Sequence, residues 1–218
     1  MKTYAGERKL GDMASITGRE WNLATELVPN REEMTRVLTA AKEWSPRDYV
    51  LFATCSHTGL RISEAIHLKS EDLVNGKMRV TRRKKRVLQP SSVEISKPIW
   101  DLLSEWAQMY DSYLFPGGAG PCVIHRRNGT ETQVCQGGHL HIRTAQTNWR
   151  GMISRAGLYV RGRGIHQTRH YFATELYAAT KDLRATQVAL AHSSSTMTEK
   201  YAHVVDQREK VNLVVPVL

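Results

Sequence analysis

The segment His166-Gln167-Thr168-Arg169 is followed by Ala191-His192-Ser193-Ser194 and then by Tyr201, nine residues after the second histidine. Together these segments bring two imidazoles, a guanidinium and a phenol into the last part of a strongly basic chain. Arg61, within residues 58–64, adds a second guanidinium. Such groups suit the holding of a phosphodiester and its attack by a tyrosine. The sequence contains no glycine-rich nucleotide loop and no obvious carboxylate cluster for Mg²⁺, so cationic side chains must meet the phosphate charge.

Composition limits the class of protein. The chain has 218 residues, 41% of them hydrophobic, which is enough for one sizeable core or two small ones. Lys and Arg number 31 against 21 Asp and Glu, a formal net charge of +10. This excess favours a polyanionic partner, because phosphate contacts supply most non-specific affinity for nucleic acid. The alternative is a basic protein with no nucleic-acid role. Three cysteines indicate a reducing compartment, and neither a membrane span nor a secretory leader is expected.

Hydrophobic periodicity predicts an α+β fold that is mainly α-helical, with a small antiparallel sheet in the N-terminal part. Helices are expected at 31–43, 62–68, 99–106, 145–156, 167–179, 183–191 and 196–209. A further helix restarts at Ser45-Pro46, and its apolar stretch at 49–55 indicates that it is buried. Two strands, 77–81 and 86–89, would be joined by a basic tip at 82–85, and Asn75-Gly76 signals a tight turn. Residues 115–140 indicate a loop with a hairpin. The apolar tail, 211–218, has strand character.

Three segments together resemble the sequence boxes of the tyrosine recombinases, also called phage integrases. They are residues 58–65, 166–174 and 190–204. The resemblance covers about residues 30–205 and implies the catalytic-domain fold of that family. We therefore expect a catalytic domain at 30–209, preceded by a lead segment at 1–29 and followed by a tail at 210–218 that docks on a neighbouring subunit.

The resemblance also implies roles for the residues of the active site. Arg61 and Arg169 would clamp the two non-bridging oxygens of the phosphate. His166 would be the general base and His192 a further donor to the phosphate. Tyr201 would be the nucleophile that becomes a 3′-phosphotyrosine.

Two further roles follow from the resemblance. Glu64 would orient the first box, and a lysine of the basic tip would be the general acid that protonates the leaving 5′ oxygen. Counting four residues from Val80 favours Lys84, with Lys85 as the rival.

The sequence departs from the family pattern at several places. Thr168 stands where the family usually has leucine, and Ala191 replaces a common glycine, which would crowd the end of a helix. The basic tip is short and lacks glycines. The first box begins so early that the separate N-terminal domain of most relatives is not expected, which makes the chain either a minimal recombinase or a catalytic fragment.

The implied activity is site-specific recombination of double-stranded DNA at specific sites of a mobile element or a chromosome-maintenance system. Two strand exchanges would pass through a four-way (Holliday) junction held by a homo-tetramer, with no metal, ATP or other cofactor. Accessory DNA-bending proteins would be further partners, and the location would be cytoplasmic, at the nucleoid. The alternatives are a type IB topoisomerase-like relaxing activity and a non-catalytic DNA-binding accessory protein of the same fold.

Four residues have a spacing close to that of zinc ligands, namely Cys122, His125, Cys135 and His139. The simpler interpretation is a hairpin with reduced thiols and DNA-facing histidines, and no metal site is assigned. Cys55 falls within an apolar helix and is interpreted as a core residue.

Overall fold

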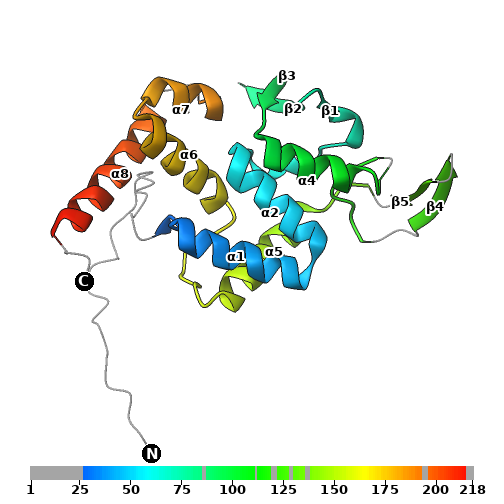
Figure 1. Cartoon of the computed structure of the whole chain (residues 1–218), viewed down its shortest axis with the longest axis horizontal. Helices are drawn as coiled ribbons and strands as arrows, with labels where there is room; N and C mark the ends of the chain where they lie inside the picture. Colours follow the sequence, from blue (N-terminus) through cyan, green and yellow to red (C-terminus); the bar gives the residue numbers. More distant parts are fainter. Residues whose placement is uncertain are drawn as a thin grey trace, which may run out of the picture.

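The computed structural model describes residues 27–84, 87–110, 112–118, 122–127, 130–135, 138–192 and 196–214. These residues form a mainly helical body with a small antiparallel sheet, which confirms the expected α+β fold (Figure 1). The helices are α1 (Arg31–Trp44), α2 (Pro46–Thr58), α3 (Ile62–Ala65), α4 (Lys97–Ala107), α5 (Ile142–Arg155), α6 (Gln167–Thr180), α7 (Leu183–Leu190) and α8 (Thr196–Val214). Most of the expected lead segment, residues 1–26, lies outside the described residues.

Helix α2 is the centre of the fold. It begins with Pro46 in its first turn, where the missing N–H costs nothing, and it ends at Gly59. The helix is buried on nearly every side, as its apolar sequence predicts, because α1, α4, α5 and α6 all pack around it. Phe52 meets the ring of Trp149 edge-on, with centroids 5.2 Å apart. Cys55 is fully buried, and burial raises the pKa of its thiol to about 12, so its interpretation as a core residue is confirmed.

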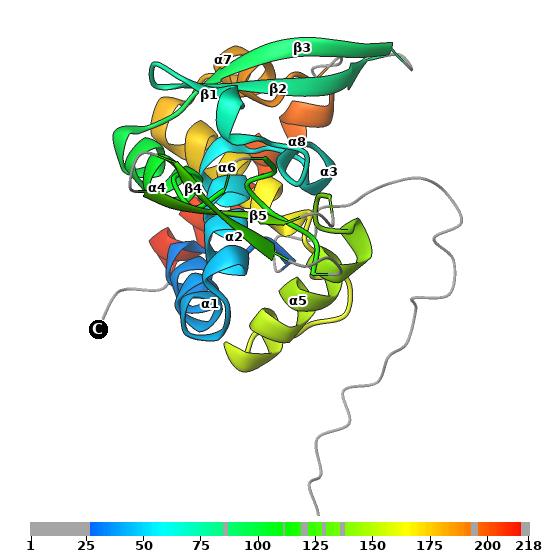
Figure 2. The same ribbon diagram turned by 90° about the vertical axis from the view of Figure 1, so that its right-hand side faces the viewer.

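The three-stranded sheet covers one end of this helical body. Strands β1 (Leu73–Val74), β2 (Lys77–Lys84) and β3 (Val87–Glu94) follow one another in the order β1-β2-β3, all antiparallel. Asn75 and Gly76 form the expected tight turn, with positive φ angles of 48° and 76°. In Figures 1 and 2 the sheet and α7 lie at the top, and α1 and α5 lie at the bottom.

Strand β2 is longer than the sequence predicted. The interpretation of residues 82–85 as a basic tip is wrong for Arg82 and Lys84, which pair with Gln89 and Val87 in the antiparallel ladder. Pairing continues through these charged residues because a ladder depends on backbone groups, which every residue here supplies. Only 85–86 remain between the strands, and both residues, Lys85 included, lie outside the described residues.

A second hairpin lies in the segment expected to be loop with a hairpin. Strands β4 (Cys122–Arg127) and β5 (Thr130–Cys135) pair antiparallel and project away from the helices (Figure 1). Cys122 is the direct backbone partner of Cys135. Among the described residues no group of three or more His, Cys, Asp or Glu is placed to hold a metal ion. The side chains of Cys122, His125 and Cys135 lie outside the described residues, so the zinc alternative stays a hypothesis.

The C-terminal helices form a layer on the other side of α2. Helix α6 packs against α2 and α8, and α7 packs against α6 and α8. Helix α8 continues to Val214, so the strand character expected for 211–218 is wrong at 211–214. No described strand lies beside this segment, and the helix satisfies its backbone groups internally. Residues 215–218 lie outside the described residues. No described helix is both long enough and apolar enough to cross a membrane.

Candidate active site

Arg169 joins three parts of the fold. It lies in the first turn of α6 and is only 6% exposed. Its Nη1 donates to the carbonyl oxygen of Gly59 at 2.5 Å, and its Nη2 donates to that of Leu190 at 2.6 Å. These carbonyls end α2 and α7, where the helix dipoles favour a cation. Desolvation, and then the charge of Arg61, lower the pKa of Arg169 to about 10, so the group is still protonated at pH 7.

Gly59 lets the end of α2 lie close to α6 and α7. Its φ of +67° lies in the left-handed region that favours glycine. A Cβ at this position would lie 2.4 Å from Cδ1 of Phe172 and 3.0 Å from Cδ2 of Leu190. The close approach of α2 to α6 and α7 therefore requires a residue with no side chain.

Arg61 is held by Glu64 in the short helix α3. Its Nη1 donates to Oε1 of Glu64 at 2.8 Å, and its backbone N–H donates to Oε2 at 2.9 Å. The carboxylate is buried, whereas 36% of the Arg61 side chain is exposed. The buried carboxylate of Glu64 thus holds the Arg61 guanidinium in place, as an orienting role for Glu64 would require.

The two predicted histidines lie near both arginines. His166 is exposed at the N-cap of α6, and partial desolvation, followed by the charges of Arg169 and Arg61, lowers its pKa. His192 follows α7, and the same causes in the same order lower its pKa to about 4, so the ring is neutral at pH 7. Its Nδ1 lies 3.1 Å from the Thr198 hydroxyl. If that hydroxyl donates, the proton of His192 is on Nε2, which can donate to an anion.

Tyr201 is 2% exposed and lies against α6 of the same chain. Its hydroxyl is 3.0 Å from Nδ1 of His170, and its ring is nearly parallel to that of His192, with centroids 6.3 Å apart. Burial raises the pKa of the phenol, and the charges of Arg169 and Arg61 partly oppose this. The phenol, both guanidinium groups and both predicted histidines therefore belong to one site.

Sequence reasoning assigned no role to His170, although this residue stands next to Arg169. It lies one helical turn after His166 on α6, so the two rings share a face. Desolvation, followed by the charge of His166, lowers the pKa of His170 to about 4. A neutral ring can accept the hydrogen bond of the Tyr201 hydroxyl. The four-residue spacing of the two histidines was the signal that could have found it.

Arg82 and Lys84 stand on β2, the strand that packs against α3. Arg82 is 8% exposed, and Glu64 and Arg61 both act on it electrostatically. Sequence reasoning placed it in a basic tip and missed this position. The backbone of Lys84 ends β2, and its side chain lies outside the described residues, so its role as general acid stays a prediction.

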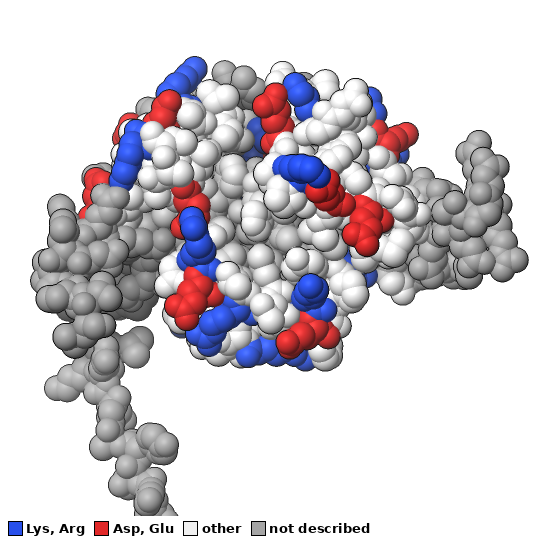
Figure 3. All heavy atoms as spheres, viewed as in Figure 1, with Lys and Arg blue, Asp and Glu red and all other residues white. Residues whose placement is uncertain are grey.

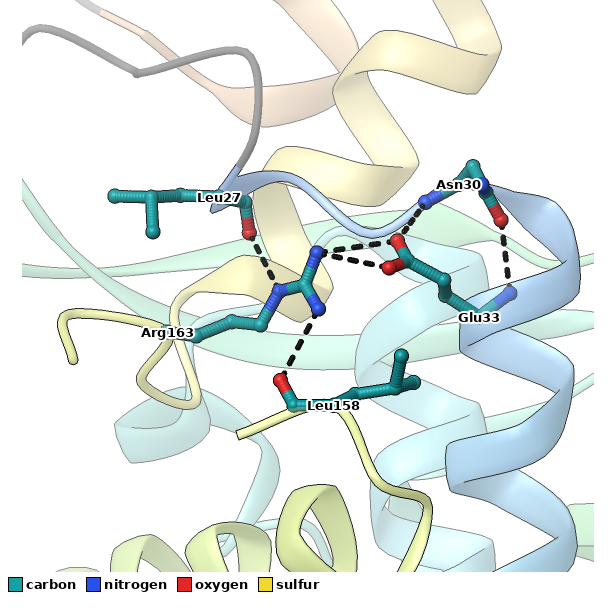
Figure 4. Close-up of polar contacts among 5 residues, drawn as sticks. All are labelled: Leu27, Asn30, Glu33, Leu158 and Arg163. Atoms are coloured by element: carbon teal, nitrogen blue, oxygen red, sulfur yellow. Dashed lines mark hydrogen bonds and ion pairs between the residues drawn. The ribbon is translucent and has the colours of Figure 1, made fainter. Parts of the chain in front are cut away.

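Arg163 fixes the segment that leads into His166. Its Nε donates to the carbonyl of Leu27 at 3.2 Å and its Nη1 to that of Leu158 at 3.1 Å (Figure 4). Its Nη2 contacts both carboxylate oxygens of Glu33, at 3.2 and 3.1 Å. Glu33 also closes the capping box of α1 with Asn30. One buried guanidinium therefore ties the loop before α6 to the start of α1.

On the face shown in Figure 3, acidic and basic side chains lie side by side around an uncharged centre. Surface ion pairs among the described residues include Arg31 with Glu175 and Lys97 with Asp101. Paired charges of both signs give this face little attraction for a polyanion.

The fold and the site define a tyrosine recombinase catalytic domain. The chain belongs to the Phage integrase family, whose sequence model matches residues 30–208. It is 30% identical to tyrosine recombinase XerD of Rhizobium meliloti over 169 residues, 74% of this chain and 49% of that protein. It is 28% identical to tyrosine recombinase XerH of Campylobacter jejuni, over 96% of this chain and 57% of that protein. The chain thus spans about half the length of these curated relatives.

Solved structures share the fold. The XerH recombinase bound to a palindromic difH substrate, a post-cleavage complex, superposes with a TM-score of 0.63 and 26% identity, over 86% of this chain and 52% of that one. The catalytic domain of bacteriophage HP1 integrase superposes with a TM-score of 0.56 and 19% identity, over 87% of this chain and 98% of that domain. The HP1 likeness concerns the fold alone.

Proposed function

We propose that the chain is the catalytic part of a site-specific recombinase that cleaves and rejoins double-stranded DNA through a 3′-phosphotyrosine. One observation carries the proposal: the phenol of Tyr201 is buried within the electrostatic reach of Arg61 and Arg169. A phenol in such a place is a nucleophile matched to an anionic electrophile. Family membership and the net charge of +10 support the same conclusion.

In the proposed step, Arg61 and Arg169 hold the non-bridging oxygens of one DNA phosphate, since a guanidinium fork fits phosphate geometry. His192 donates to the same group. The bond between Tyr201 Oη and phosphorus forms while the bond from phosphorus to the 5′ oxygen breaks. The phosphate stays on the tyrosine as a diester, so a later 5′-hydroxyl can reverse the step.

Two protons must move for this exchange to balance. The phenol proton leaves Tyr201 for a base, and His166 is the exposed neutral imidazole at the site. The departing 5′ oxygen takes a proton from a general acid, the role we assign to Lys84 at the end of β2. Both transfers are general acid–base catalysis, which typically contributes about 10²–10⁴-fold to a rate.

The wider assembly is part of the proposal. Two exchanges in a homo-tetramer, through a four-way junction, would recombine two sites, with accessory DNA-bending proteins as further partners. Residues 210–218, which begin within the last turns of α8, would pack on a neighbouring subunit. Deleting 215–218 alone, and then 210–218, should lower the tetramer fraction on DNA in analytical ultracentrifugation. An undiminished tetramer after both deletions would rule out this contact.

The decisive experiment traps the covalent adduct. Purified protein is mixed with a pool of nicked duplexes of randomised sequence, from which the released short strand diffuses away. We expect an adduct that resists denaturant with wild type and none with Tyr201→Phe, and sequencing the attached strand gives the cleavage site. Peptide mapping should place the nucleotide on Tyr201.

Other outcomes separate the alternatives. If the protein forms the adduct and relaxes supercoiled DNA but never exchanges strands between duplexes, its activity is like that of a type IB topoisomerase. Tight DNA binding with no adduct anywhere in the pool would point to a non-catalytic DNA-binding protein. Either result contradicts the proposal.

A further inference from the structure

Strand β2 presents an arginine on its buried face. Met78, Val80 and Arg82 alternate along the strand and are 0%, 3% and 8% exposed, whereas Arg79 is exposed on the opposite face. This is the period-two pattern of a strand with one face on the core. Arg82 therefore occupies a position where a hydrophobic residue would be expected, at the end of the strand that packs against α3.

The guanidinium of Arg82 lacks partners for its most buried atoms. Nε and Nη2 are both buried, and neither has a hydrogen-bond partner among the described residues. The nearby carboxylate does not fill this need: the oxygens of Glu64 accept hydrogen bonds from Arg61, and neither Nε nor Nη2 of Arg82 bonds to them. Buried donors without a partner are rare in folded proteins, and a buried cation without one is rarer.

The charges around Arg82 also fail to balance. Arg61, Arg82 and Arg169 act on one another electrostatically, and Glu64 is the carboxylate that acts on both Arg82 and Arg169. Among the described side chains of this cluster, three positive groups and one negative group leave +2. A phosphodiester carries one negative charge, and a pentacoordinate arrangement formed by addition of a phenolate to it carries two. The cluster is therefore complementary to the transition state rather than to the resting substrate.

We propose that Arg82 is a third phosphate-binding guanidinium, whose Nε and Nη2 donate to a non-bridging oxygen of the phosphate held by Arg61 and Arg169. This inference rests on the proposed function and assigns it one more catalytic residue. A planar fork with two adjacent N–H groups directed at one anion is the geometry in which arginine binds phosphate best. The free site then carries a like-charge cost that a bound phosphate relieves.

The test uses wild-type protein, Arg82→Gln, Arg82→Lys and, as a matched control, Arg79→Gln. The control removes the same charge from the same strand on its solvent face, where Arg79 donates to the Glu71 carbonyl. Single-turnover adduct formation is measured on the captured nicked substrate. We expect Arg82→Gln to be slower by about 10²-fold, as for loss of one donor to a developing oxyanion. Arg82→Lys should be intermediate, and Arg79→Gln should stay within about twofold of wild type.

A second substrate distinguishes phosphate contact from a structural role. A methylphosphonate at the scissile position replaces a charged non-bridging oxygen by a methyl group. On this substrate we expect Arg82→Gln and wild type to form adduct at similar rates. The melting temperature of free Arg82→Gln should equal or exceed that of wild type, because the substitution removes an unpartnered buried cation.

Each failure has its own signature. No adduct with wild type would refute the proposed function itself. Adduct with wild type and an unchanged rate with Arg82→Gln would refute only the inference. A penalty of the same size on the methylphosphonate, or a lower melting temperature for free Arg82→Gln, would show that Arg82 has a structural role and would also overturn the inference.

Discussion

Gly59→Ala is the substitution that separates backbone conformation from close packing at this site. The new methyl group would adopt φ +67°, and it would meet Phe172 at 2.4 Å and Leu190 at 3.0 Å. Left-handed backbone costs a residue with a Cβ about 1 kcal/mol or more. Overpacking adds about 1–3 kcal/mol when neighbouring side chains must shift. The free energy of unfolding should therefore fall by about 2–4 kcal/mol.

Gly76→Ala is the matched control. Gly76 has φ +76°, and a Cβ there would meet nothing within 4 Å. The two variants share the left-handed cost and the same gain from a stiffer unfolded chain, so their difference isolates the clash. The control should lose about 1 kcal/mol, or roughly 2–4 °C in melting temperature for a chain of this size.

Urea denaturation followed by circular dichroism measures both variants. Adding Phe172→Leu to Gly59→Ala should recover part of the loss, so that the double variant is more stable than the sum of the single effects by about 1 kcal/mol. Equal losses for Gly59→Ala and Gly76→Ala, or strict additivity with Phe172→Leu, would refute the reasoning. Adduct formation by Gly59→Ala should also slow, because the Gly59 carbonyl accepts a hydrogen bond from Arg169.

Three further predictions concern residues around the site. Ala191 has φ +50° at the end of α7, so Ala191→Gly should raise the unfolding free energy by up to about 1 kcal/mol in the same assay; a loss would contradict this. Arg163→Met should lower it by about 2–4 kcal/mol, since Glu33 loses a buried partner; an unchanged urea midpoint would contradict this. His170 and His192 have pKa values near 4 in the fold and about 6.5 unfolded, so the unfolded state binds more protons between these values. Stability should therefore fall as pH drops from about 6.5 to 4, and His170→Gln should flatten that profile.

The fold was predictable because its elements carry strong local signals. The helix at Arg31–Trp44 has a capping box and a regular apolar stripe, and the tight turn at Asn75-Gly76 needs residues that tolerate positive φ. The end of β2 was not predictable, because a run of basic residues has the composition of a solvated turn even where its backbone pairs with a neighbouring strand. The prediction of strand character for 211–214 was wrong for a related reason. A short apolar run suits a strand and a helix equally until its neighbours in the fold are known.

The site was predictable in its members but not in their contacts. The family resemblance supplied Arg61, Arg169 and Tyr201, and the structure places them together. No sequence pattern indicates that Arg169 bonds the carbonyls of two helix ends, because such contacts depend on tertiary approach. Arg82 was missed because its burial follows from strand register, which shifts side chains to the opposite face with every residue.

Opposing influences on Tyr201 constrain how its proton is lost. Burial raises the pKa of the phenol, and the nearby arginines lower it, with burial the larger effect. A bound phosphate anion would neutralise part of the arginine charge, so substrate binding removes an influence that favours ionisation. Ionisation before attack therefore becomes harder when the substrate arrives. The proton must leave as the bond to phosphorus forms, which requires a base close to the phenol at that moment. His170 Nδ1 lies 3.0 Å from the hydroxyl, but a pKa near 4 makes this ring a weak base, better suited to position the hydroxyl than to take its proton. We therefore assign the proton transfer to His166, the exposed histidine four residues before it.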